Sequence, residues 1–263
     1  MKVTVLQENL ARGLSVVSRA VSPRSTLPVL SNILIATDEG RLRLSATNLE
    51  LGITCWIAAR IDEEGSTTVP SRTFGDLVNT LPGDQVQLTL DVKTQSLHVK
   101  GGTSNNDIKC IDAQEFPPLS VPEMEGAMQL NVADFKEMIQ QVAFAASTDE
   151  SRPVLMGVLL HVEKEKLTMA AADGFRLSVR KAVLSNPAAH PLNVIIPARA
   201  LNELARVAAD GEDPIYMVVP KNRGQVLFRV KDVEVVSQLI DGTFPDYQQI
   251  IPRNYKSRTL VST

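Results

Sequence analysis

The chain has 263 residues, of which 44% are apolar and 22% are charged. This is the composition of a folded globular protein, so a disordered tail is excluded, and the length is sufficient for two domains of about 130 residues. With 27 Lys and Arg against 30 Asp and Glu, the net charge is −3. A histone-like nucleic-acid binder is therefore excluded, and any contact with DNA must come from local basic patches.

No window of the sequence approaches 18 uninterrupted apolar residues, the length of a membrane-spanning helix. The first nine residues, Met1–Asn9, break off before a secretory apolar region could form, so we expect a cytoplasmic protein with no membrane partner. The two cysteines, Cys55 and Cys110, have neither CxxC spacing nor metal-site grouping. We predict that both are buried free thiols.

The chain repeats itself. Three segments recur in register, at offsets of 125, 127 and 128 residues: Thr26–Asn32 as Ser151–Gly157, Val69–Arg72 as Ile196–Arg199, and Glu115–Pro118 as Thr243–Asp246. One matching segment would be chance, but three in register indicate a duplicated unit whose offset drifts only through small loop insertions.

Each unit predicts the same order of elements. A short strand comes first (Lys2–Leu6, Met128–Val132) and an amphipathic helix follows it, with apolar residues at Leu6, Leu10, Leu14 and Val17 in the first unit and at Val132, Phe135, Ile139 and Val142 in the second. Further strands follow (Leu42–Ala46, Leu167–Ala171), then a second helix that starts near Arg72 and Arg199, then more strands (Val86–Leu90, Gln225–Val230).

The pattern predicts an α+β fold of tandem repeated domains, each with two helices packed on an antiparallel sheet. It argues against the parallel βαβ layout of a dinucleotide-binding domain. We expect the first domain at 1–126 and the second at 127–254, with the boundary near Glu123 to Ala127. Residues 255–263 correspond to the first strand of each unit, so we expect them to begin a third domain that is otherwise absent.

Polar stripes lie opposite the apolar faces of the predicted helices. Their members recur at helical spacing: Glu8, Arg12, Ser15 and Arg19; Arg72, Asp76 and Asn79; Lys136 with Gln140; and Arg199, Glu203 and Arg206. Together the stripes contain six basic and four acidic residues when Glu137 is included, so the electrostatic potential of these helix faces is weakly positive. From the residues alone, ordinary solvated helix faces explain these stripes equally well.

Three segments carry a resemblance to a known family. They are Thr26–Leu30 (TLPVL), Ala172–Leu177 (ADGFRL) and Leu239–Tyr247 (LIDGTFPDY). With the duplicated units, they closely resemble the bacterial sliding clamps, the beta subunits of the replicative DNA polymerase III. The resemblance spans essentially the whole chain. It implies three such domains per chain, closed head to tail as a homodimer into a ring around duplex DNA, with helices lining the hole.

The resemblance places DNA contacts on the helix faces and in one loop. The implied DNA-binding residues are Arg12, Arg24, Arg72, Arg199, Arg206 and Arg152. Arg24, in the loop ahead of the expected Leu27–Leu30 strand, aligns with a family position that contacts DNA. Arg152 is the only candidate in the corresponding loop of the second unit, because Asp149 and Glu150 would repel phosphate. A weakly basic lining is what a sliding ring needs, since tight phosphate contacts would stop it.

The resemblance also places a pocket for partner peptides in the second unit. The matching residues are Leu155, Gly174, Phe175, Arg176, Leu177, Pro245 and Ile250. Taken alone, Asp173-Gly174 is an ordinary tight turn and the arginine beside it an ordinary surface charge. Two positions depart from the family pattern: Ala172 stands where threonine is frequent, and Gln249 where a basic residue is common. Both departures are expected to alter specificity.

The implied partners are duplex DNA, the polymerase III catalytic subunit, the clamp loader, and other polymerases and repair proteins that carry clamp-binding peptides. Ring closure in the family joins the first domain of one chain to the third domain of the other. We place Ile108, on a predicted edge strand near Asn105 to Ile111, in that contact, although an apolar residue there is equally often part of the core.

An enzyme is the alternative that the residues support least, and no cofactor is implied. His98, His161 and His190 are scattered without metal-site spacing, and there is no glycine-rich phosphate loop. A deep polar pocket gathering His161, Asp173 and Arg176 would revive catalysis. A third possibility is a peptide-binding scaffold that does not encircle DNA, which would keep the second-unit groove without needing basic helix faces.

Overall fold

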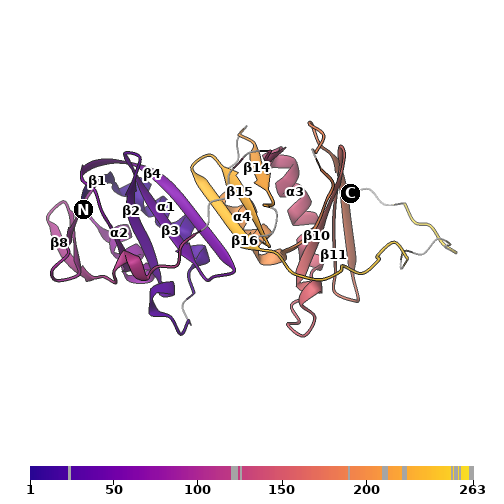
Figure 1. Ribbon diagram of the computed structural model, residues 1–263, viewed down its shortest axis with the longest axis horizontal. Coiled ribbons are helices and arrows are strands. Elements are labelled where there is room, and N and C mark those ends of the chain that lie inside the picture. The colour runs from indigo at the N-terminus through magenta and orange to yellow at the C-terminus, as the bar shows by residue number, and fades with distance from the viewer. Residues whose placement is uncertain are drawn as a thin grey trace.

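The computed structural model describes residues 1–22, 25–119, 124, 126–188, 190–208, 213–220, 224–249, 251, 254 and 256–260. Two α+β domains lie side by side along the long axis of the molecule (Figure 1). No helix in the described part of the chain is long and apolar enough to cross a membrane.

The first domain contains two helices, α1 (Gln7–Val17) and α2 (Ser71–Thr80), and eight strands: β1 (Lys2–Leu6), β2 (Asn32–Asp38), β3 (Arg41–Thr47), β4 (Leu51–Glu63), β5 (Ser66–Pro70), β6 (Gln85–Asp91), β7 (Ser96–Gly101) and β8 (Ser104–Lys109). The second domain repeats this order with α3 (Val132–Val142), α4 (Ala198–Val207), β9 (Met128–Leu130), β10 (Gly157–Glu163), β11 (Lys166–Ala172), β12 (Leu177–Val183), β13 (Leu192–Pro197), β14 (Ile215–Val218), β15 (Gln225–Val230) and β16 (Val233–Gln238).

The sheet topology shows the duplication directly. In the first domain the strands run β5-β2-β3-β4 and β8-β7-β6-β1, and in the second they run β13-β10-β11-β12 and β16-β15-β14-β9. Neighbouring strands pair antiparallel, for example β2 with β3 and β10 with β11. The predicted fold class is therefore confirmed.

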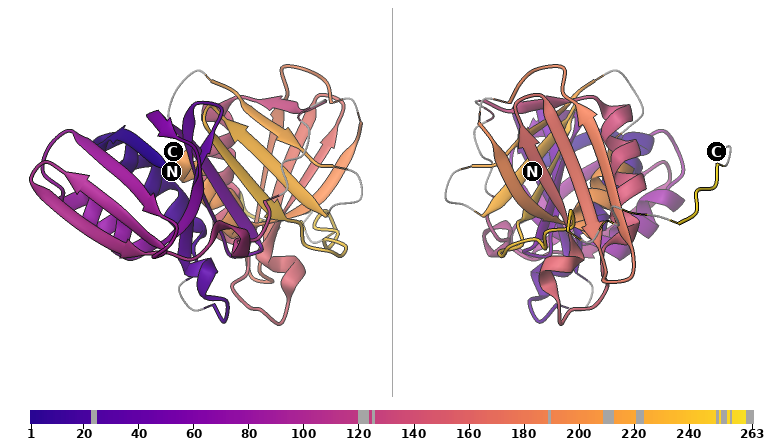
Figure 2. Two further views of the ribbon diagram at one scale, coloured as in Figure 1. Left: turned by 60° about the vertical axis from the view of Figure 1, so that its left-hand side comes forward. Right: turned by 90° about the vertical axis from the view of Figure 1, so that its right-hand side faces the viewer.

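Each helix packs the apolar face that its periodicity predicts. α1 buries Leu10, Leu14 and Val17, and α3 buries five residues: Val132, Phe135, Met138, Ile139 and Val142. The predicted helices near Arg72 and Arg199 begin directly after Pro70 and Pro197, because a proline terminates a strand and does not need the N–H that a helix start leaves unpaired. Helices of both domains lie on one side of the molecule (Figure 2, right).

One sheet continues across the boundary between the domains. The first half of β4 pairs antiparallel with β16, so that Ile53 lies opposite Val235. Two further contacts cross the same junction: Arg41 Nη1 lies 2.7 Å from Asp232 Oδ1, and the Trp56 backbone N–H donates to the Asp232 carbonyl. Within the first domain, Arg41 also stacks on the Trp56 ring at 5.7 Å. Most of the buried apolar residues of both domains form one connected cluster.

Three expectations need correction. Leu27–Leu30 was expected as a strand, but Pro28–Ser31 forms a 3-10 turn, because proline favours the first position of a helical turn. Leu6 ends β1 and is 48% exposed, so the buried face of α1 starts at Leu10. Cys55 is buried but Cys110 only half-buried; both are free thiols, and burial raises the pKa of Cys55 to about 11.

The expected start of a third domain, at residues 255–263, lies partly outside the described residues. Among the described residues near the C-terminal end, 256–260 have no regular secondary structure and are exposed. The expected domain boundary lies partly outside the described residues, since Glu123 and Glu125 are not among them.

Candidate DNA-binding face and partner site

Four arginines that the sequence assigns to DNA lie exposed on the helices. Arg12 is on α1, Arg72 on α2, and Arg199 and Arg206 on α4. Arg12 donates to the Asn9 side chain at 3.2 Å. The Arg72 side chain is 95% exposed and its Nε lies 3.8 Å from the Asp76 carboxylate. Such exposed pairs are weak, so these guanidinium groups remain available to an external anion.

The structure joins two of the predicted stripes through one carboxylate. Glu203 on α4 accepts from Arg206 at 2.8 Å and from Arg19, which follows α1, at 3.2 Å. Its side chain is only 12% exposed. Arg19 and Glu203 are 184 positions apart and belong to different domains, so spacing along the chain gives no signal of their contact. The first and second domain therefore contribute to one helical surface.

A groove of about 800 Å³ lies between α1 and α2 on this surface. Ser15, from the polar stripe of α1, lines it together with all three members of the α2 stripe: Arg72, Asp76 and Asn79. The sequence predicted both stripes separately, and the structure brings them to opposite walls of one hollow. The groove itself was not predicted, because it depends on how the two helices pack.

Three other predicted positions differ in their surroundings. Arg24 lies outside the described residues. The Arg152 guanidinium pairs with Asp149 at 3.1 Å and lies 3.2 Å from where a Cβ on Gly174 would stand, so it borders the partner site rather than the helical surface. Lys136 of the α3 stripe is half-buried and donates to the Ala208 carbonyl at 2.9 Å, tying α3 to the end of α4.

The partner-site turn is built around Asp173. Its Oδ1 accepts from the backbone N–H groups of Phe175 and Arg176 at 2.9 and 2.8 Å, and its Oδ2 accepts from Arg176 Nε at 2.9 Å. These bonds, the backbone ones foremost, lower the pKa of Asp173 to about 2. Gly174 supplies the positive φ of +93° that the turn requires.

This turn projects Phe175 into solvent. Its side chain is 96% exposed, while Arg176 lies over the ring of Phe144 at 6.0 Å. Phe144, which is 59% exposed, follows α3 and was not among the predicted partner residues. Two exposed phenylalanines beside an arginine form an apolar surface at the outer end of the turn.

The segment after β16 lies on the outer face of the β10–β13 sheet. Phe244 is buried against Ala170 and Ile195, and Val154, Val179, Ile240 and Tyr247 surround this cluster. Gly242 passes so close to Val154 that a Cβ would stand 2.7 Å from its Cγ2. The repeated Phe-Pro pair in the sequence indicated this segment. Its apolar neighbours could not be predicted, because they are brought together only in the folded sheet.

Predicted partner residues from three segments therefore lie on one face of the second domain. Leu155 is half-buried in the 3-10 turn Pro153–Met156, Leu177 begins β12, and Pro245 is exposed beside Phe244. Ile250 lies outside the described residues. Phe175 and Pro245 expose their side chains to solvent on this open face.

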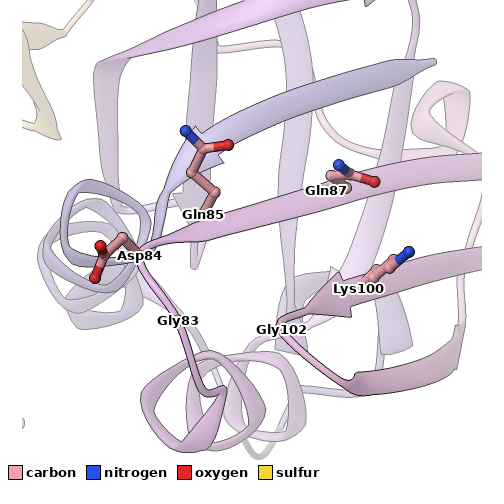
Figure 3. A pocket seen from close by; sticks show the side chains of 6 residues that line it. All are labelled: Gly83, Asp84, Gln85, Gln87, Lys100 and Gly102. Atoms are coloured by element: carbon pink, nitrogen blue, oxygen red, sulfur yellow. The ribbon is translucent and has the colours of Figure 1, made fainter.

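A second hollow, of about 390 Å³, lies at the ends of β6 and β7 (Figure 3). Gly83, Gly102, Gln85 and Gln87 line it, with the Asp84 carboxylate and the Lys100 amine at opposite ends. The charged groups do not converge, so it offers no catalytic arrangement.

The residues that would revive catalysis are not gathered in a pocket. Asp173 and Arg176 pair within the partner-site turn, and His161 lies on β10 between Thr168 and Asn193 of the neighbouring strands. None of the three lines either hollow. Among the described residues, no group of three or more His, Cys, Asp or Glu side chains is arranged to hold a metal ion.

Ile108 lies on β8, which is an edge strand as predicted. Its side chain is only 7% exposed and belongs to the core cluster. Of the two alternatives, a contact with another chain or a core position, the side chain therefore occupies the core position. What the edge offers to another chain is the outer backbone of β8 and the exposed side chains of Asn105, Asp107 and Lys109.

Two family models match the chain. The model described as the DNA polymerase III beta subunit, N-terminal domain, matches residues 1–120, and the model of the central domain matches residues 129–246. The Staphylococcus epidermidis protein named beta sliding clamp is 34% identical over 97% of this chain and 69% of its own length.

Solved structures agree with these matches. A DNA polymerase sliding clamp from Bacillus subtilis has a TM-score of 0.92 at 31% identity, covering 97% of this chain and 68% of its own. A sliding clamp from Pseudomonas aeruginosa bound to griselimycin has a TM-score of 0.90 at 29% identity, covering 97% and 69%.

Proposed function

This chain belongs to the bacterial beta sliding clamp family, and we propose that its helical surface faces duplex DNA inside a closed ring that keeps the replicative polymerase on its template. A clamp performs no chemistry of its own. It acts by topology, so its contacts with DNA must be numerous enough to centre the duplex and weak enough to let the ring slide. Such a clamp acts in the cytoplasm, where the bacterial replication machinery works.

The observation that carries this proposal is the joining of the helix faces across the domain junction. Arg19 of the first domain and Arg206 of the second share Glu203, which makes one surface of two separate stripes. On this surface five arginines accompany three carboxylates: Arg12, Arg19, Arg72, Arg199 and Arg206 with Glu8, Asp76 and Glu203. The excess positive charge is small, as a sliding contact requires.

Charge reversal tests the DNA face. Arg72→Glu and Arg199→Glu, one in each domain, should each weaken binding of the chain to a labelled duplex by about tenfold at low salt and lower primer-extension processivity with the cognate polymerase and loader. Lys181→Glu, at an exposed lysine of β12 that belongs to none of the helix stripes, is the matched control. Unchanged duplex binding in both arginine variants would leave only the peptide-binding scaffold.

We further propose that the open face of the second domain binds partner peptides from the polymerase, the loader and repair proteins. A Pseudomonas aeruginosa relative was solved with griselimycin bound, which supports a ligand site in this fold. Phe175 is the natural anchor because it is 96% exposed. Phe175→Ala or Leu155→Ala should weaken binding of a clamp-binding peptide about tenfold with an unchanged melting temperature, since apolar anchors carry most of such an interface. Equal affinity would contradict the assignment.

Ring closure through the β8 edge remains a proposal as well. An edge strand with free backbone groups favours pairing with a strand of another chain. The β4–β16 pairing inside this chain is an example of such a junction between two domains of this fold. Light scattering of the protein expressed from its natural reading frame tests it: a dimer that is lost when Asn105 or Asp107 is replaced by proline would support the β8 contact.

A further inference from the structure

Asp-Gly pairs are the most reactive peptide units of a protein chain, and this sequence has three: Asp173-Gly174, Asp210-Gly211 and Asp241-Gly242. The glycine backbone nitrogen attacks the side-chain carboxyl carbon of the neutral aspartic acid. A C–N bond forms as a carboxyl C–O bond breaks, the amide proton leaves with the hydroxyl as water, and a succinimide ring remains. Glycine favours the attack because it has no Cβ to shield its nitrogen. The second pair lies outside the described residues, and the other two differ in what holds the carboxylate.

The carboxylate of Asp173 is held on both oxygens. Oδ1 accepts from the backbone N–H groups of Phe175 and Arg176, and Oδ2 accepts from Arg176 Nε at 2.9 Å. These bonds lower the pKa of Asp173 to about 2, so its reactive neutral form is populated roughly 60-fold less at neutral pH than that of a carboxyl with the ordinary pKa. Attack by the Gly174 nitrogen would also require the carboxylate to leave these donors. The fold therefore protects this pair.

Asp241 has no such protection. Its side chain is exposed, and within the described part of the chain its carboxylate accepts no hydrogen bond and forms no ion pair. The Gly242 backbone N–H likewise donates to no described acceptor. Gly242 itself is required, because it has φ +135° and a Cβ would stand 2.7 Å from Val154 Cγ2. The packing thus demands the glycine of the reactive pair and leaves the aspartate beside it unrestrained.

The residues on either side of this pair are anchored. The Ile240 N–H donates to the Ile195 carbonyl at 2.9 Å, and its side chain lies against the cluster in which Phe244 is buried on Ala170 and Ile195. When water opens the succinimide at its other carbonyl, the main chain runs through the former side-chain carboxyl group and is one carbon atom longer. Because the cluster is closely packed, an extra backbone atom between Ile240 and Phe244 must displace one of them.

The corresponding segment of the first domain does not contain this pair. Since Glu115–Pro118 repeats as Thr243–Asp246, the residues that match Asp241-Gly242 are Ala113-Gln114. There the preceding Asp112 accepts from the Gln114 backbone N–H at 2.8 Å and caps a 3-10 turn, so its carboxylate is held. The reactive pair is therefore particular to the second domain and does not follow from the repeated fold.

We propose that Asp241-Gly242 is a site of isoaspartate formation, and that the rearranged chain binds partner peptides more weakly because Phe244 is displaced from the β10–β13 sheet. The water lost in ring closure is regained in ring opening, so no other reactant is needed. The isoaspartyl carboxyl group is then a substrate for enzymes that methylate isoaspartate with S-adenosylmethionine. The effect on peptide binding rests on the proposed partner site, whereas the modification itself does not.

Incubation of the chain in water labelled with oxygen-18, at neutral pH, tests the modification. Each succinimide that is hydrolysed takes up one heavy oxygen, which peptide mass spectrometry assigns to its position. Asp241 should be labelled at least about tenfold faster than Asp173 in the same sample, because Asp173 is kept ionised and bonded. Asp241→Glu is the matched control: it keeps the charge, but ring closure through the longer side chain is much slower, so the label at this position should disappear.

Two results would overturn the site. Labelling of Asp241 only after unfolding in urea would show that the fold protects it, and equal labelling of Asp241 and Asp173 would show that the hydrogen bonds of Asp173 do not distinguish the pairs. A methyltransferase assay with labelled S-adenosylmethionine measures the isoaspartyl fraction independently. It should rise with incubation in the wild-type protein and stay lower in Asp241→Glu.

Peptide binding tests the consequence separately. The isoaspartyl fraction of the wild-type protein should bind a fluorescent peptide from the clamp-binding segment of the cognate polymerase about fivefold more weakly than fresh protein, whereas incubated Asp241→Glu should bind it unchanged. Equal affinity of modified and fresh protein, with Phe175→Ala still weakening binding, would contradict the link to Phe244 and leave the partner site intact. If Phe175→Ala has no effect either, the proposed partner site fails.

Discussion

The helix pairs of the two domains share one scaffold and differ in what they expose. Leu10 and Leu14 of α1 and Phe135 and Ile139 of α3 are all buried against their sheets. Outside the core the pairs have diverged: Gly75 and Asp76 of α2 correspond to Asn202 and Glu203 of α4. A core side chain is constrained by every neighbour it packs on, whereas an exposed one is free to change. The duplicated fold thus supplies two surfaces that can serve different purposes.

The end of the first helix in each domain gives the sharpest contrast. Arg19, after α1, reaches across the junction to Glu203, whereas Phe144, at the corresponding place after α3, lies 59% exposed beside Arg176. One position has become part of the link between domains and the other part of the open partner face. Neighbouring domains, rather than the fold of each unit, determine that difference.

The cores offer the largest expected effect. Phe74→Ala in the first domain and Phe135→Ala in the second should each lower the free energy of unfolding by about 3 to 5 kcal/mol, because both rings are fully buried. Phe135 also packs on Phe228 at 6.1 Å between ring centres. Urea unfolding followed by circular dichroism measures both losses. A loss below about 1 kcal/mol in either variant would show that its domain core is not the packed one described.

The matched carboxylates of α2 and α4 should differ in cost. Glu203→Ala removes two ion pairs from a side chain that is 12% exposed and should destabilise the protein by about 1 to 2 kcal/mol. Asp76→Ala removes one distant pair from a side chain that is 77% exposed and should cost less than about 0.5 kcal/mol. The single tryptophan, Trp56, lies at the junction, so its fluorescence during unfolding reports whether Glu203→Ala loosens it. Equal losses of stability in the two variants would show that the carboxylates of α2 and α4 do not differ in this way.

Corresponding turns carry different residues at the position that needs positive φ. Leu49 has φ +76° in the first domain where Gly174 has φ +93° in the second. A leucine in this region is strained, so Leu49→Gly should raise the free energy of unfolding by about 0.5 to 1 kcal/mol even after the added freedom of the unfolded chain. Gly174→Ala should have the opposite sign. Thermal unfolding of both variants measures the pair, and a destabilised Leu49→Gly would show that the leucine side chain matters more than its backbone strain.

The same turns should respond differently to acid. Asp173 accepts two backbone N–H bonds, and so does Asn48 in the first domain, from Glu50 and Leu51. Because the pKa of Asp173 is lowered to about 2, its stabilising bonds are present above pH of about 4 and are lost as the pH falls toward 2. Amide exchange of Phe175 and Arg176 should therefore accelerate over that interval in a two-dimensional NMR titration.

The first-domain turn and one variant serve as controls for this acid response. The amides of Glu50 and Leu51 should not follow it, since the Asn48 amide does not titrate. Asp173→Asn should abolish the response at Phe175. Parallel behaviour of both turns in the wild-type protein would point to global unfolding instead.

Much of the architecture could be predicted from the sequence because it depends on local signals. The apolar period of α1 and α3, the prolines before α2 and α4 and the Asp-Gly turn at residue 173 each act through neighbours in the chain, and each was predicted. The three segments repeated in register indicated two units of the same fold before any pairing of strands was known. The polar stripes and the partner-site turn were predicted for the same reason.

Only the tertiary structure decided which of these elements meet. The pairing of β4 with β16, the contact of Arg19 with Glu203 and the groove between Ser15 and Arg72 join residues that are far apart in the sequence. The same holds for Ile108 and Lys136, whose exposure could not be read from their strand and helix positions. Periodicity tells which face of an element is apolar, but what covers that face is determined by the packing of the whole chain.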